Sequence, residues 1–143
     1  MSLYDTDFAQ WAQTQAALLR AGDFDALDLP NLIEEVDDLR RRELHALESR
    51  LIQLLTHLLK WRSQPERRQT GHSWEYSIRE QRRRIARLLR QNPSVRPELP
   101  AMVDDVYPDA VLRAARQTRL PASTFPATCP WSVDQVLDDD FWP

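Results

Sequence analysis

The feature that most constrains this fold is a long stretch, residues 31–64, that contains neither proline nor glycine. Apolar side chains recur along it at three- and four-residue spacings, the period of an α-helix with one buried side. The residues on this side are Leu32, Val36, Leu47, Leu51, Leu54, Leu58 and Trp61. Asp28 can cap the start, and Pro30 fits the first turn, where its missing N–H needs no partner. The pattern predicts one helix from about Leu29 to Arg62.

Shorter helices are predicted on both sides of the long one. Apolar residues from Phe8 to Leu19 keep the helical period, and Gly22 can end that helix. Thr6 or Asp5 can cap its start. After the long helix, Ser73 can cap a third helix that runs from Trp74 to Gln91. Its predicted buried face consists of Trp74, Ile78, Ile85, Leu88 and Leu89.

The last third of the chain is rich in proline. A fourth helix is predicted from Val95 to about Arg119, with kinks at Pro100 and Pro108, because each proline removes an intrahelical hydrogen bond. Residues 120–130 are expected to be extended. Residues 132–137 are predicted to form one turn with a capping box, in which a serine and a glutamine exchange hydrogen bonds with the backbone.

These elements predict an all-α fold: a single four- to five-helix bundle built around the long helix, with a Pro-rich irregular C-terminal segment. We expect one domain over residues 1–143. Hydrophobic residues make up 42% of the chain, which is enough for a core. Only two glycines occur, too few for a phosphate loop, a dinucleotide fingerprint or a nucleophile elbow.

The same composition favours a soluble protein of the cytoplasm. Cys129 is the only cysteine, so no intrachain disulfide can form, and we expect it to be an inert thiol. No run of about 18 apolar residues exists, so no membrane span is expected. Asp5 and Asp7 near the start argue against a signal peptide. The net charge of −3 is too small to indicate a class of partner.

Three ionisable residues form a polar seam on the long helix. Successive members of the set Glu43, Arg50 and His57 are seven residues apart, so they lie at similar angles around the helix, at the edge of its apolar side. One interpretation is a ligand-binding groove with His57 as acid or base. The other is a paired network that fixes helix register. A hydrolase-type enzyme that uses Glu34, Glu35, Glu43 or His57 in an interhelical pocket stays an alternative.

An arginine stripe marks the third helix, on the side away from its apolar face. It consists of Arg79, Arg83, Arg87 and Arg90, flanked by Arg82 and Arg84. Arginine suits phosphate recognition because its fork binds two oxygens at once, and about four phosphate contacts would give a salt slope near −4. Nucleic-acid binding is therefore one alternative. In the other, the acidic residues at 34, 35, 37 and 38 neutralise the stripe across an antiparallel helix pair.

The leading functional prediction is a non-enzymatic protein-interaction or regulatory module, in one form self-associating. It is based on Ile52, Leu55 and Leu59, which widen the apolar surface of the long helix toward its back. We expect no metal and no cofactor. His45 and Glu48 are three residues apart, but the histidines lack zinc-site spacings and no Glu-x-x-His pair occurs.

As a set, several short segments resemble the bacterial family catalogued as domain of unknown function twenty-nine. The segments are YDTDF (4–8) with Trp11, NLIEE (31–35), HLLKW (57–61), QPERR (64–68), SW (73–74), IREQR (78–82), TFP (124–126) and CP (129–130). The resemblance implies a helical bundle in a bacterial cytoplasm, and it implies no activity or catalytic residue. The chain departs from the family pattern at Pro100 and Pro108.

Overall fold

The computed structural model describes residues 1–68 and 72–143, with the side chain of His72 excepted. Every regular element in those two ranges is a helix, so the all-α prediction is confirmed. The α-helices are α1 (Leu3–Thr6), α2 (Phe8–Ala21), α3 (Leu29–Ser63), α4 (His72–Gln91), α5 (Leu99–Thr118) and α6 (Val133–Leu137). The short 3₁₀ turns are η1 (Phe24–Ala26), η2 (Pro65–Arg67), η3 (Pro93–Glu98) and η4 (Ala122–Thr124).

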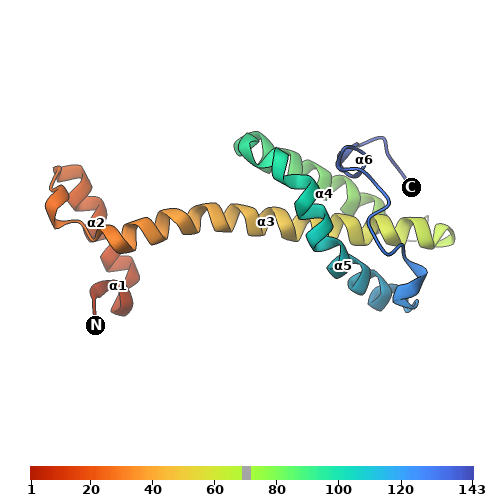
Figure 1. Cartoon of the computed structure of the whole chain (residues 1–143), viewed down its shortest axis with the longest axis horizontal. Coiled ribbons are helices and arrows are strands. Elements are labelled where there is room, and N and C mark those ends of the chain that lie inside the picture. Colours follow the sequence, from red (N-terminus) through yellow and green to blue (C-terminus); the bar gives the residue numbers. More distant parts are fainter. Residues whose placement is uncertain (69–71) are drawn as a thin grey trace. The chain divides into compact units, whose positions relative to one another are not determined.

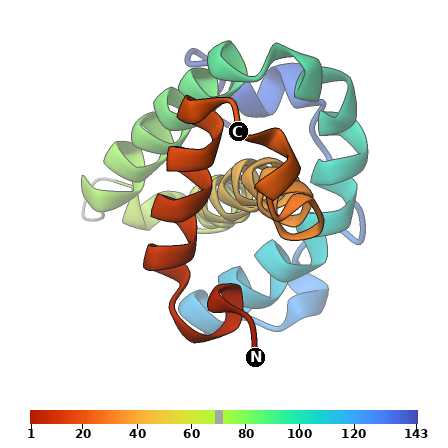
Figure 2. The same cartoon turned by 90° about the vertical axis from the view of Figure 1, so that its left-hand side faces the viewer.

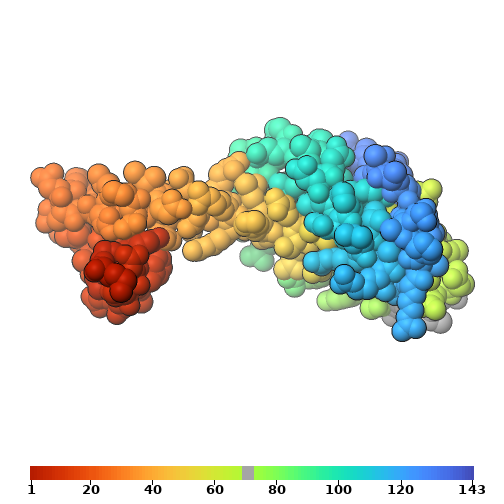
Figure 3. Space-filling model, turned by 60° about the horizontal axis from the view of Figure 1, so that its bottom comes forward, coloured from red at the N-terminus to blue at the C-terminus, as the bar shows by residue number. Residues whose placement is uncertain are grey.

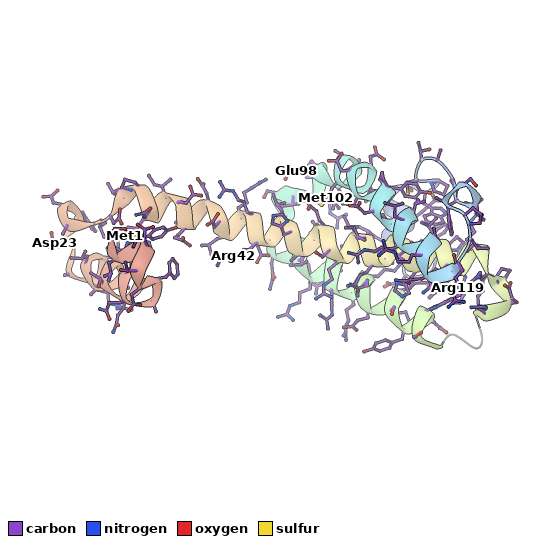
Figure 4. The ribbon with its side chains drawn as sticks, turned by 90° about the horizontal axis from the view of Figure 1, so that it is seen from below. Met1, Asp23, Arg42, Glu98, Met102 and Arg119 are labelled. Carbon is purple, nitrogen blue, oxygen red and sulfur yellow. The ribbon has the colours of Figure 1, made fainter. Side chains whose placement is uncertain are left out.

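The long helix is confirmed as one unbroken element, α3, which ends a single residue later than predicted (Figure 1). By its contacts the chain divides into two compact units. Unit 1 is residues 1–42 and unit 2 is residues 43–143, so α3 contributes its first half to one and its second half to the other. Arg42, labelled in Figure 4, is the last residue of unit 1.

Unit 1 holds α1, α2, η1 and the first half of α3. Asp7 caps α2, because its carboxylate accepts a hydrogen bond from the backbone N–H of Gln10 at 3.0 Å. The predicted caps Thr6 and Asp5 are wrong, since both residues lie inside the additional short helix α1. Gly22 ends α2 in the left-handed conformation, with φ at +73°, as its position predicts.

Three polar contacts join the first two helices of unit 1 to α3. The Nε1–H of Trp11 donates to Asp28 at 2.9 Å, and the backbone N–H of Asp28 donates to the side-chain oxygen of Gln15 at 2.8 Å. The Tyr4 hydroxyl donates to Glu35, whose acceptance of this bond raises the pKa of Tyr4 to about 12. Trp11 is 4% exposed and is the only buried apolar residue of unit 1 in the described chain.

Unit 2 builds a core around the second half of α3. Helix α4 runs antiparallel to α3: Asn92 donates to Glu43 at 2.9 Å, and Gln81 donates to Gln53 at 2.8 Å. Viewed along α3, α4 and α5 lie on different sides of it (Figure 2), and α6 contacts both. The buried core consists of Leu47, Leu51, Leu54, Leu55, Leu58, Leu59, Ile78, Ile85, Leu89, Val95, Leu99, Met102, Val103, Val106, Tyr107, Ala110, Ala114, Phe125, Trp131 and Val136.

The first residues of α4 and α5 differ from the predicted ones. Helix α4 begins at His72, so Ser73 lies inside the helix and the predicted cap at Ser73 is wrong. The fourth helix begins at Leu99, after a 3₁₀ turn, rather than at Val95. Pro100 therefore occupies the first turn of α5, where it removes no hydrogen bond, and the kink predicted there is wrong.

Buried and aromatic side chains hold the C-terminal segment on unit 2. Arg82 donates from Nε to the carbonyl of Val136 at 2.9 Å and from Nη2 to that of Phe141 at 2.8 Å. Trp142 packs on Trp61 with ring centroids 4.8 Å apart. The capping box predicted for residues 132–137 is confirmed in α6.

Candidate functional site

The exposed apolar side chains gather in unit 1. The described chain exposes eleven large apolar side chains, and nine of them belong to the first 42 residues. These nine are Met1, Leu3, Phe8, Leu19, Phe24, Leu29, Ile33, Val36 and Leu39. Single exposed apolar residues are common on protein surfaces, but a concentration of this kind makes unit 1 a candidate functional surface.

Three of these residues form one stripe along α3, which we call the apolar stripe. Leu29, Ile33 and Val36 are separated by four and three residues, so they share one side of the helix. The side chains of Ile33 and Val36 are 60% and 63% exposed. On the face shown in Figure 3, the N-terminal residues (red) lie in front of part of unit 1, and the rest of the first half of α3 (orange) is visible beside them.

The exposure of Val36 corrects the prediction that this residue belongs to the buried side of the long helix. Helix α2 attaches through Asp28, which directly precedes α3, and α1 attaches through Glu35, which lies on a different side of α3 from Val36. The stripe around Val36 therefore has no covering helix within unit 1. The spacing of apolar residues correctly identifies the apolar side of the helix, but it does not show whether that side is buried.

Charged residues beside the apolar stripe are paired within their own helix. Arg41 binds Glu34 at 3.0 Å and also binds Asp38, and Arg42 lies 3.8 Å from Glu35. The ion-pair partners of Glu34, Glu35 and Asp38 are thus arginines of the same part of α3.

The partner surface predicted from the back of the long helix is wrong. Leu55 and Leu59 are 0% and 1% exposed and belong to the core of unit 2, and Ile52 packs against that core. The helices of unit 2 cover α3 on more than one side, so its widened apolar surface is used within the chain.

The polar seam does not assemble into one site. The Glu43 carboxylate accepts from Asn92, while His57 donates from Nδ1 to the backbone carbonyl of Gln53 at 2.8 Å. Fourteen residues of helix separate Glu43 from His57, which corresponds to about 21 Å. Burial lowers the pKa of His57, the Gln53 carbonyl raises it, and the charge of Lys60 lowers it further. The third member, Arg50, turns toward a different group of residues.

The arginine stripe of α4 is divided by the structure. Arg79 is engaged elsewhere: it binds Glu75 at 3.1 Å and lies over the Trp142 ring at 5.0 Å. The other three predicted residues line a surface pocket of about 480 Å³. We call it the arginine pocket, and its lining residues are Glu80, Arg83, Arg84, Arg87 and Arg90.

One carboxylate serves this pocket. Glu80 accepts from Arg84 at 2.7 Å and also from Arg83, and these two bonds, the Arg84 bond first, hold the pKa of Glu80 below its ordinary value. A second pocket of about 250 Å³ shares Arg84 and Arg87 and adds Arg50 from α3. Arg50, which spacing grouped with Glu43 and His57, is therefore grouped by the structure with the arginines of α4.

Two buried cations were missed by the sequence reasoning. Lys60 donates to Gln117 at 2.9 Å and lies over the Trp74 ring at 5.0 Å, and burial lowers its pKa. Arg82, described above, is 2% exposed. A signal for Arg82 exists in the sequence, since it lies four residues after Ile78 and three before Ile85, on the buried face of α4.

The described residues contain no group of three or more His, Cys, Asp or Glu side chains placed to hold a metal ion. Cys129 is half-buried, and burial raises the pKa of its thiol above its ordinary value. Within the described ranges, no helix combines the length and the apolar composition needed to cross a bilayer.

Fold and surfaces together define a small all-α protein in which one long helix is shared by two units. The chain belongs to the family described as Domain of unknown function DUF29, whose model matches residues 3–142. No curated protein and no solved structure matches it. The family description assigns no activity, so function has to be argued from the two surfaces described above.

Proposed function

We propose that this protein is an interaction module that associates with a second copy of itself through the apolar stripe of unit 1. The observation that carries this proposal is the exposure of Leu29, Ile33 and Val36 on one side of α3. Removing each half-exposed side chain from water is worth about 1 kcal/mol. Within unit 1, no other segment covers these three side chains.

The charge pattern of the helix favours a second copy as the partner. Acidic residues occupy positions 34, 35, 37 and 38, and arginines occupy positions 40, 41 and 42. When two such helices pack antiparallel about a two-fold axis near Leu39, the acidic block of one lies beside the basic block of the other. An isologous two-fold interface uses the same patch on both partners and therefore needs this self-complementarity.

The architecture of unit 1 supports the same conclusion. Helices α2 and α3 form a hairpin that buries a single apolar side chain, Trp11. Two helical hairpins that pair across their open sides make a four-helix bundle, the usual way for such helices to obtain a core. Chains of about 40 residues generally depend on oligomerisation or cross-links to be stable.

The test is sedimentation equilibrium over a concentration series on the full chain. The wild type is expected to pass from monomer to dimer. Replacing Ile33 and Val36 together by Glu should weaken the dimer at least about 100-fold, because four carboxylates would be desolvated across the interface. Leu112→Glu is the matched control, since Leu112 is a similarly exposed apolar residue in unit 2.

Circular dichroism on each variant checks that the helices persist. A wild type that stays monomeric at every concentration contradicts the proposal. So does a Leu112→Glu variant that weakens association as much as the double variant, because the effect would then not belong to the apolar stripe.

A further inference from the structure

We infer that the arginine pocket of unit 2 binds a row of phosphate groups. Four arginines of α4 face one glutamate there, and Arg50 of α3 extends the positive surface through the adjoining pocket. No carboxylate lies within ion-pair distance of Arg50, Arg87 or Arg90 among the described residues. The cluster thus keeps an unbalanced positive charge.

Helix stability alone does not account for this cluster. Cations near the C-terminus of a helix interact favourably with its dipole, but the effect is confined to the last turn. That explanation covers Arg90, near the end of α4, and leaves out Arg83, Arg84 and Arg50. The last of these three belongs to another helix.

The geometry indicates phosphate as the ligand group. Each guanidinium can bind two oxygens of one phosphate, and Arg83 to Arg90 span about 10 Å along α4. That length corresponds to about three successive phosphates of one nucleic-acid strand. No aromatic residue lines either pocket, so there is no platform on which a base could stack. The site reads phosphates and not bases.

Two sources can supply such a row: the backbone of a nucleic-acid strand or a linear polyphosphate. The first experiment measures the fluorescence anisotropy of a labelled oligothymidylate with the full chain at rising salt. About three phosphate contacts on a single strand predict a salt slope near −2, or an affinity loss of about 20-fold for a fourfold rise in salt. Unlabelled tripolyphosphate and poly-glutamate are then added as competitors.

Two matched variants locate the binding. Arg87→Gln removes one positive charge inside the pocket and should weaken binding about fivefold and flatten the salt slope. Arg79→Gln removes one charge from the same helix outside the pocket and should change the affinity less than about twofold. Neither residue is buried, so both variants are expected to fold.

The competitors separate the two sources. Displacement by tripolyphosphate at equal phosphate concentration supports a phosphate site that accepts either source, and retention of the oligonucleotide supports a nucleic-acid backbone alone. Absence of binding to both probes at low salt overturns the inference. Equal weakening by Arg79→Gln and Arg87→Gln also overturns it, as does equal competition by poly-glutamate.

Discussion

The two halves of α3 share one helix and differ in what covers them. Every buried residue of α3 lies in the second half, which forms the centre of unit 2. The first half carries an equally regular apolar pattern, yet its stripe is exposed in unit 1. Regular spacing therefore shows which side of a helix is apolar, while burial depends on whether other segments of the chain reach that side.

The difference also separates the sources of stability. Unit 2 has 101 residues and a continuous core drawn from three long helices and the C-terminal segment. Unit 1 depends on Trp11, on the hydrogen bonds of Asp28 and Glu35, and on the helical continuity of α3. We therefore expect substitutions to be costly in unit 2 and mild in unit 1, unless a second copy covers unit 1.

The largest expected effect tests this contrast directly. Leu59→Ala should lower the free energy of unfolding by about 2–5 kcal/mol, because it removes a fully buried side chain and leaves a cavity. Ile33→Ala, at a dilution where the chain is monomeric, should change it by less than about 0.5 kcal/mol. Urea unfolding followed by circular dichroism measures both.

Similar losses for the two variants in the monomer would contradict the contrast between the two halves of α3, because Ile33 would then be as important to the fold as Leu59. A loss at Ile33 that appears only at high protein concentration would strengthen the contrast. That result would place the stabilisation in the association of two chains.

The second effect concerns Arg82, one of the two buried cations of unit 2. Arg82→Met should lower the free energy of unfolding by about 3 kcal/mol, because the carbonyls of Val136 and Phe141 lose a charged donor. The C-terminal segment should also be cleaved faster by a protease. Arg87→Met is the control on the same helix, at an exposed position before the last turn, and should leave both measurements nearly unchanged.

Much of the fold could be predicted because it depends on local patterns. The bounds of α3, the cap at Gly22 and the buried face of α4 follow from spacing and from residues with special backbone preferences. The predicted caps at Asp5 and Thr6 are wrong because the short helix α1 includes both residues, and the cap at Ser73 is wrong because α4 begins at His72. The kink at Pro100 is wrong because α5 begins only at Leu99.

The surfaces were harder to predict because they depend on tertiary packing. A wide apolar side, as at Leu55 and Leu59, is compatible with a partner or with a central position in the bundle, and only the placement of the other helices decides. Arg50 shows the same limit, since its pocket neighbours Arg84 and Arg87 are distant in sequence. Helical spacing predicts the burial of Arg82, because this arginine lies on the same face of α4 as the buried residues Ile78 and Ile85.

The smallest effect is a difference in pH dependence between the units. Burial lowers the pKa of His57 below its ordinary value of 6.5, so between that lowered pKa and 6.5 the unfolded chain binds a proton that the folded chain does not. The stability of unit 2 should therefore fall as the pH falls through this window, by at most about 1.4 kcal/mol per pH unit. His57→Gln should remove this dependence.

Unit 1 should respond only at lower pH. Hydrogen bonds from Asn31 and then Trp11 hold the pKa of Asp28 below its ordinary value of 3.8, so its contribution is present above 3.8 and is lost as the pH falls through the lowered pKa. Indole N–H signals in an NMR titration can follow Trp11 in unit 1 separately from Trp61 in unit 2. If both signals change together between pH 6.5 and 3.8, the units unfold as one, and the contrast between them does not extend to their stability. If Trp61 changes first and His57→Gln abolishes that step, the buried histidine belongs to a core that unit 1 does not share.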